Sequence, residues 1–167
     1  MRKNLIALID RQAIVHNIGI LKAARPRHAF CAAIKCNAYG HGTAAVLPAM
    51  QQAAVDMLAV ANTAEAEELR RFGWSGPILM FGSELSIYPP QEKKNIALWL
   101  VENEIRPTPM RCCDVQSLVE AAEKCGKKAK LHLKLDTGMH RMGLDEQGAY
   151  QIINEFRNCR HIEFEGL

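Results

Sequence analysis

Short apolar runs alternate with longer amphipathic stretches along almost the whole chain. The short runs are apolar on both faces, which is typical of strands buried in a parallel sheet. The runs that we predict as strands are residues 5–9, 29–35, 57–61, 77–81, 96–101, 129–135 and 162–167.

The amphipathic stretches between these runs have helical periodicity and carry recognisable helix ends. Asp10 is expected to cap the first helix, because its carboxylate can accept hydrogen bonds from the free N–H groups of the first turn. Glycines are expected to stop two of the helices. The predicted helices are residues 11–24, one that starts at Thr63 and stops at Gly73, residues 114–125 stopped by Gly126, and one opened by Asp145.

Repeated strand–helix units without tight hairpin turns predict an α/β fold with a parallel sheet. Such a sheet is either open and doubly wound or closed into a (β/α)8 barrel. No Gly-x-Gly-x-x-Gly string follows the early strands, which argues against a dinucleotide-binding sheet. The pattern alone leaves the choice open.

Composition excludes several classes of protein. Apolar residues make up 49%, charged residues 23%, and the net charge is +3 without a basic block interleaved with aromatic residues, so we expect no nucleic-acid partner. No apolar run approaches the length of a membrane span, and the N-terminal run is too short for a signal peptide. The cysteines form no Cys-x-x-Cys pair, so free thiols are expected and a metal site is not. A cytoplasmic protein without membrane contact is therefore expected.

Candidate chemistry is concentrated at Lys35, where the apolar run 29–35 ends and residues 35–42 read Lys-Cys-Asn-Ala-Tyr-Gly-His-Gly. A lysine at the end of a buried strand is costly to keep charged, so it is a usable amine nucleophile for a Schiff base with an aldehyde. Tyr39 offers a hydroxyl on a glycine-rich turn whose N–H groups could approach a phosphate.

Residues 35–42 resemble the pyridoxal phosphate attachment site of the alanine racemases, the fold-type III family. A second string, residues 134–143, reads Lys-Leu-Asp-Thr-Gly-Met-His-Arg-Met-Gly and resembles another segment of that family, with His140 where a glycine is more usual. The resemblance extends over essentially the whole chain but only about the first half of the family's usual length. It implies a (β/α)8 TIM-type barrel, here incomplete with about six strands.

The same resemblance implies a single N-terminal cofactor-binding domain over residues 1–167, truncated at about the sixth strand and lacking the C-terminal β-domain. Residues 5–9 would belong to that β-rich domain. The opposite-face base would lie outside this chain, and the full-length protein would be a homodimer. The chain alone is expected to be inactive.

By resemblance, Lys35 is the catalytic residue and holds pyridoxal 5'-phosphate, and Tyr39 binds its phosphate. Arg141 contacts the cofactor's phenolic oxygen and the substrate carboxylate, a task that suits a planar guanidinium. Lys134 matches a lysine that is often carbamylated in the family and then orients the arginine. Asp136 is expected to stabilise the turn that leaves the strand.

The implied activity is the racemisation of L-alanine and D-alanine, a small-molecule amino-acid substrate, to supply D-alanine for peptidoglycan. Three alternatives stay open. One is a serine or broad-specificity racemase, a second is a non-catalytic pyridoxal phosphate-binding protein of the same fold, and a third is a degenerate product without function.

Overall fold

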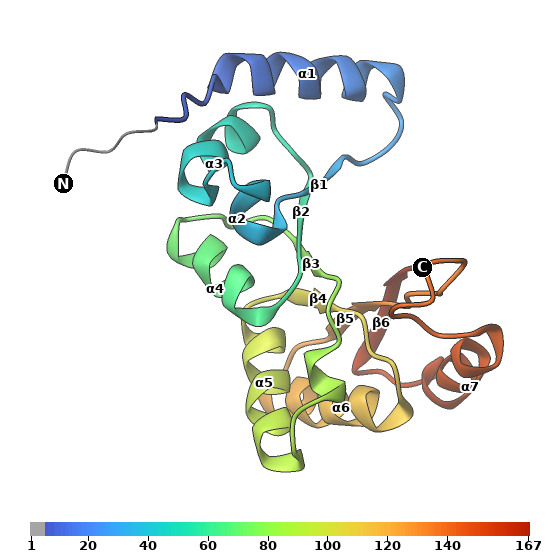
Figure 1. Cartoon of the computed structure of the whole chain (residues 1–167). Helices are drawn as coiled ribbons and strands as arrows, with labels where there is room; N and C mark the ends of the chain where they lie inside the picture. Colours follow the sequence, from blue (N-terminus) through green and yellow to red (C-terminus); the bar gives the residue numbers. More distant parts are fainter. Residues whose placement is uncertain (1–5) are drawn as a thin grey trace.

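Short parallel strands run through the middle of the molecule (Figure 1). The computed structural model describes residues 6–167. Strands β1 to β4 pair in sequential order in one sheet, and β5 and β6 pair in a second. The strand bounds are β1 Cys31–Ala33, β2 Met57–Val60, β3 Ile78–Met80, β4 Ile105–Pro107, β5 Ala129–His132 and β6 Ile162–Gly166.

Helices separate the strands, and α3 to α6 follow one another along one side of them (Figure 1). Helix α1 packs on α3, α5 on α6, and α6 on α7. The bounds are α1 Arg11–Ala24, α2 Lys35–Tyr39, α3 Thr43–Gln52, α4 Thr63–Arg71, η1 Glu84–Ser86, α5 Pro90–Glu102, α6 Cys112–Cys125 and α7 Glu146–Phe156.

The strand order confirms the α/β prediction and favours the barrel over the open sheet. A doubly wound sheet reverses its strand order at a switch point, whereas barrel strands follow one another in sequence. Here β1 to β4 are sequential, and β5 contacts β4. The described residues therefore contain six strands of an incomplete (β/α)8 barrel.

Side chains, rather than a backbone ladder, join the two sheets. Among residues 6–167, no ladder hydrogen bonds connect β4 to β5. Arg106 of β4 instead reaches Glu165 of β6, with its Nε 2.9 Å from Oε2. This guanidinium is buried, and its hydrogen bond is the largest cause that lowers the pKa of Glu165 below its usual value.

Most predicted strands are confirmed, although each is shorter than expected; these are 29–35, 57–61, 77–81, 129–135 and 162–167. The prediction at 96–101 is wrong, because these residues lie in α5. Ala97, Leu100 and Val101 are buried at helical spacing, and a short apolar run cannot by itself distinguish a buried strand from a buried helix face. The true fourth strand, Ile105–Pro107, has no apolar run that could have predicted it.

The predicted helix ends agree closely with the structure. Asp10 accepts hydrogen bonds from the N–H groups of Gln12 and Ala13 at 2.9 and 3.0 Å, and Asp145 caps α7 in the same way. Helix α4 begins at Thr63 as predicted. Gly126 is the cap residue directly after α6, as predicted, and its backbone lies in the left-handed region. Helix α6 starts at Cys112, two residues before the predicted Asp114.

The strand predicted at residues 5–9 is not found. Leu5 lies outside the described residues, and residues 6–10 have no regular secondary structure. Ile6 and Leu8 are 76% and 91% exposed, so no neighbouring strand covers them. Within residues 6–167, no helix is both long and apolar enough to cross a bilayer.

Candidate cofactor site

The turn that carries Lys35 has an unusual backbone. Cys36, Asn37, Ala38 and Tyr39 all have φ between 52° and 53°, so the segment labelled α2 is a left-handed turn. Left-handed helical backbone costs L-residues about 1–2 kcal/mol each and normally occurs at single positions. Such strain persists where the surrounding structure holds it, and it is concentrated at functional sites.

Hydrogen bonds hold this turn at both ends. At its start, the Ala38 N–H donates to the Ile34 carbonyl at 2.9 Å. At its end, the Asn37 side-chain oxygen accepts from the Thr43 N–H at 2.7 Å, which connects the turn to α3. His41 Nδ1 lies 3.0 Å from the Ala38 carbonyl, a further contact within the turn.

Lys35, Lys134 and Arg141 line one pocket of about 260 Å³, although they come from segments far apart in the chain. Lys35 follows β1, while Lys134 and Arg141 lie in the loop after β5. The other lining residues are Cys36, Ala61, Phe81, Gly82 and Met142. Because none of these carries a carboxylate, the pocket offers three cations to an anionic ligand beside small and apolar side chains.

The loop that carries Arg141 is folded back on itself. The Leu144 N–H donates to the Lys134 carbonyl at 2.7 Å, and the Lys134 ammonium donates to the Met142 carbonyl. Asp136 accepts from the His140 N–H at 2.9 Å and from the Gly138 N–H at 3.2 Å. These bonds lower the pKa of Asp136 below its usual value and confirm its predicted role in the turn.

Arg141 is exposed and makes no side-chain hydrogen bond or ion pair within residues 6–167. In particular, it forms no ion pair with the nearby acids Asp136 or Asp145. Arg141 is among the residues that line the pocket and is free to bind a ligand there.

Tyr39 does not join the other predicted residues. Its side chain is 59% exposed and does not line the pocket that contains Lys35. The phosphate-binding role of Tyr39 stays a prediction.

Sequence reasoning missed two acidic residues beside the pocket. The Glu65 carboxylate accepts from the Cys36 N–H and from the Ala61 N–H, both at 2.7 Å. Glu84 accepts from the Thr63 N–H at 3.0 Å, and its burial raises its pKa. The spacing from Asn62 to Glu65, a polar cap followed by an acid three residues later, is a signal that could have indicated the first of them.

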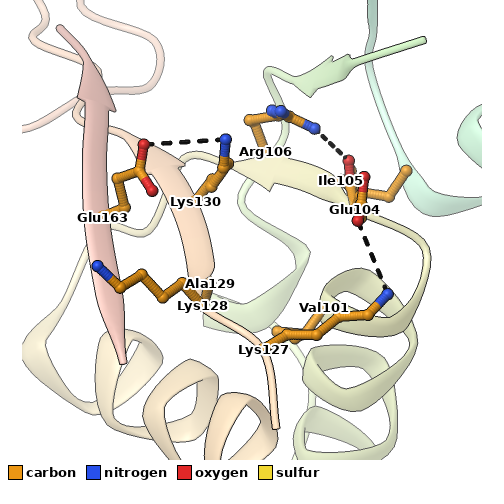
Figure 2. A pocket seen from close by; sticks show the side chains of 9 residues that line it. All are labelled: Val101, Glu104, Ile105, Arg106, Lys127, Lys128, Ala129, Lys130 and Glu163. Atoms are coloured by element: carbon orange, nitrogen blue, oxygen red, sulfur yellow. Dashed lines mark hydrogen bonds and ion pairs between the residues drawn. The ribbon is translucent and has the colours of Figure 1, made fainter. Parts of the chain in front are cut away.

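A second pocket, of about 330 Å³, lies where β4, β5 and β6 begin (Figure 2). It has four cations, of which three are already engaged, while Lys128 makes no side-chain hydrogen bond or ion pair within residues 6–167. Lys127 lies 3.8 Å from Glu104, Lys130 lies 3.8 Å from Glu163, and Arg106 donates to the Glu104 carbonyl (Figure 2). The pocket at Lys35 is the candidate site, because it lies at the carboxyl ends of the strands, where barrel enzymes have their active sites, whereas the second pocket lies where the strands begin.

Comparison with known families gives a consistent result. A family model described as "Alanine racemase, N-terminal domain" matches residues 9–167. An alanine racemase of Methanococcus maripaludis is 40% identical over 163 residues, which are 96% of this chain and 42% of that relative. An alanine racemase 2 of Caldanaerobacter subterraneus is 38% identical over 161 residues, with 95% and 39% covered. The chain therefore spans about two fifths of the length of the curated relatives it matches.

Solved structures agree. Alanine racemase from the D-cycloserine-producing Streptomyces lavendulae superposes with a TM-score of 0.79 at 28% identity, covering 95% of this chain and 40% of that one. A Clostridium difficile alanine racemase in complex with cycloserine has a TM-score of 0.74 at 33% identity, with 93% and 40% covered.

Proposed function

Since this chain belongs to the alanine racemase N-terminal domain family, we propose that it is the cofactor-binding part of a racemase that interconverts L-alanine and D-alanine. The full-length protein would act in the cytoplasm as a homodimer and supply D-alanine for peptidoglycan. The base on the opposite face of the substrate would come from outside this chain.

The observation that carries the proposal is the convergence of Lys35, Lys134 and Arg141 on one pocket. A lysine amine beside two further cations, with no carboxylate among the lining residues, is an unusual arrangement unless an anion is to be bound. Its location after strand β1 is where barrel enzymes have their active sites, at the carboxyl ends of the strands.

The residues present fit pyridoxal 5'-phosphate. The cofactor has an aldehyde, which matches the Lys35 amine, and anionic oxygens, which match the cations of Lys134 and Arg141. Phe81 and Met142 offer apolar surface for its flat ring. When bound, the cofactor supplies the electron withdrawal that makes the α-proton of an amino acid removable.

The chain's own residues would divide the remaining work. Lys35 Nζ would attach the cofactor and, once displaced by substrate, would remove the α-proton from one face of one enantiomer or deliver it to that face to form it, while the opposite face is served from outside this chain. The Arg141 guanidinium binds the substrate carboxylate or the cofactor's phenolic oxygen. Lys134 holds the segment next to Arg141 through its bond to the Met142 carbonyl, and carbamylation would turn it into an acceptor for that guanidinium.

The proposal is tested by trapping the cofactor on the protein. The purified chain is mixed with pyridoxal 5'-phosphate, reduced with borohydride, digested and analysed by mass spectrometry. We expect a single adduct, on Lys35, because this lysine lines the pocket beside two further cations, and the other lysine there, Lys134, already bonds to the Met142 carbonyl.

Two variants make the trapping experiment specific. Lys35→Ala is expected to abolish the adduct, and Lys94→Ala, which removes a surface lysine of α5, is expected to leave it unchanged. Adducts distributed over surface lysines, with no preference for Lys35, would contradict the proposal.

A further inference from the structure

Strand β1 leaves the sheet at the residue before Lys35, and this interrupts the backbone ladder. The Ile34 N–H still donates to the Ala59 carbonyl of β2 at 2.9 Å. In a continuing parallel ladder, the Ala61 N–H would donate to the Ile34 carbonyl. That carbonyl instead accepts from the Ala38 N–H of the left-handed turn, so the Ala61 N–H loses its ladder partner.

Glu65 occupies the interruption. One of its carboxylate oxygens accepts from the Ala61 N–H and the other from the Cys36 N–H, the first N–H group after Lys35. Both bonds measure 2.7 Å, the short distance of a bond to a charged acceptor. A single carboxylate thus replaces the missing ladder bonds between the ends of β1 and β2.

Helix α4 does not need this carboxylate for its own capping. Glu65 is the third residue of α4 after the cap Asn62, whose side chain accepts from the Glu65 N–H at 2.9 Å. In a capping box the acid at this position bonds back to the N–H of the cap residue. Here it reaches past the cap to Ala61 and across to Cys36, both of which line the pocket with Lys35.

We infer that Glu65 is a positioning residue for the cofactor lysine: its carboxylate fixes the ends of β1 and β2 and thereby the direction in which Lys35 enters the pocket. The inference rests on the proposed function of Lys35. Glu65 would touch neither cofactor nor substrate and would act only through the backbone on either side of the site.

The length and charge of the side chain are both needed for this role. Glutamine retains one acceptor, but its amide NH2 group would point at the second N–H donor, so it can satisfy only one of the two amides. Glu65→Gln is therefore expected to be intermediate between the unmodified chain and Glu65→Ala. Glu67 is the matched control, because it is an exposed acid on the same helix.

The first measurement needs no cofactor: residue-resolved amide hydrogen exchange. In Glu65→Ala, we expect the Cys36 and Ala61 amides to exchange about tenfold faster, the effect of losing a hydrogen bond to a charged group. In Glu67→Ala, both rates are expected to stay unchanged.

The second measurement is the cofactor concentration that half-labels Lys35, determined on folded protein. It is expected to rise about tenfold in Glu65→Ala and less in Glu65→Gln. A merely structural role would lower the melting temperature without changing that concentration. If Glu65→Ala does not fold, both the exchange rates and the labelling concentration are compared between Glu65→Gln and the unmodified chain.

Equal exchange rates and equal labelling in Glu65→Ala and Glu67→Ala would overturn the inference. Failure of the unmodified chain to label Lys35 selectively would contradict the proposed function alone. The exchange comparison would then still decide whether Glu65 holds the turn.

Discussion

Alanine in place of Asp114 is expected to lower the free energy of unfolding by about 3–5 kcal/mol, the cost of leaving a buried charge without its partner. Asp114 is fully buried at the start of α6, and its Oδ1 lies 2.9 Å from the ammonium of Lys93, itself buried in α5. Ser86 and Arg111 also donate to this carboxylate. Removal of the carboxylate therefore leaves an unpaired ammonium between the two helices.

The same group predicts how stability depends on pH. Burial alone would raise the pKa of Asp114, but hydrogen bonds from Arg111, Ser86 and Lys93 outweigh it, so the pKa lies below its usual value. A carboxyl with a lowered pKa in the folded state contributes stability that is complete above its unfolded pKa. That contribution is lost as the pH falls through the folded pKa. The free energy of unfolding of Asp114→Ala is therefore expected to fall less on acidification than that of the unmodified chain.

Denaturant unfolding measures both effects, and the chain offers a matched control. Lys94 and Glu120 form an ion pair between the same two helices, but both side chains are about half exposed, at 60% and 47%. Glu120→Ala is expected to cost less than about 1 kcal/mol. If Asp114→Ala and Glu120→Ala lowered the free energy of unfolding by similar amounts, burial of the Lys93–Asp114 pair would have no effect on stability.

The second large effect is expected for Gly82→Ala, in the wall of the pocket. A Cβ atom at this position would overlap the Ala61 carbonyl oxygen, which is backbone and cannot turn aside. The ends of β2 and β3 would have to separate, at a cost of about 1–3 kcal/mol. Since Ala61 and Gly82 line the pocket together, selective labelling of Lys35 by pyridoxal 5'-phosphate is expected to fall about tenfold or more.

Gly138→Ala is the control for this variant, because a Cβ there meets no atom within 4 Å. It is expected to keep both the melting temperature and the labelling of Lys35. Unchanged labelling in Gly82→Ala would mean that the pocket wall adapts, and that the close approach of the two strand ends is not required.

Sequence reasoning succeeded where a signal is local. The caps of α1 and α7 were predictable because Asp10 and Asp145 act on the next turn of their own helices. It failed for β4, whose three residues include Arg106 and Pro107, since this strand is specified by its neighbours rather than by its own apolarity. The run at 96–101 was misassigned because a short apolar run reads alike for a buried strand and for the buried face of a helix.

The residues of the candidate site were likewise predictable only where their signal is local. Lys35, Lys134 and Arg141 were found from two strings of residues, and the fold brings them to one pocket. Glu65 was missed because its importance lies in a bond to Cys36, 29 positions away in the chain. Tyr39 was expected to join Lys35, but its side chain is 59% exposed and does not line that pocket.

That opposite hand has a consequence for chirality. Residues 36–39 adopt the backbone that D-amino acids prefer, so the usual penalty for an enantiomeric residue is reversed over four consecutive positions. A D-alanine at position 38 would occupy its own favoured region of φ and ψ, whereas the same residue in α1 or α6 would be strained. The backbone beside Lys35 is therefore a short stretch of mirror-image conformation maintained by a chain of L-residues.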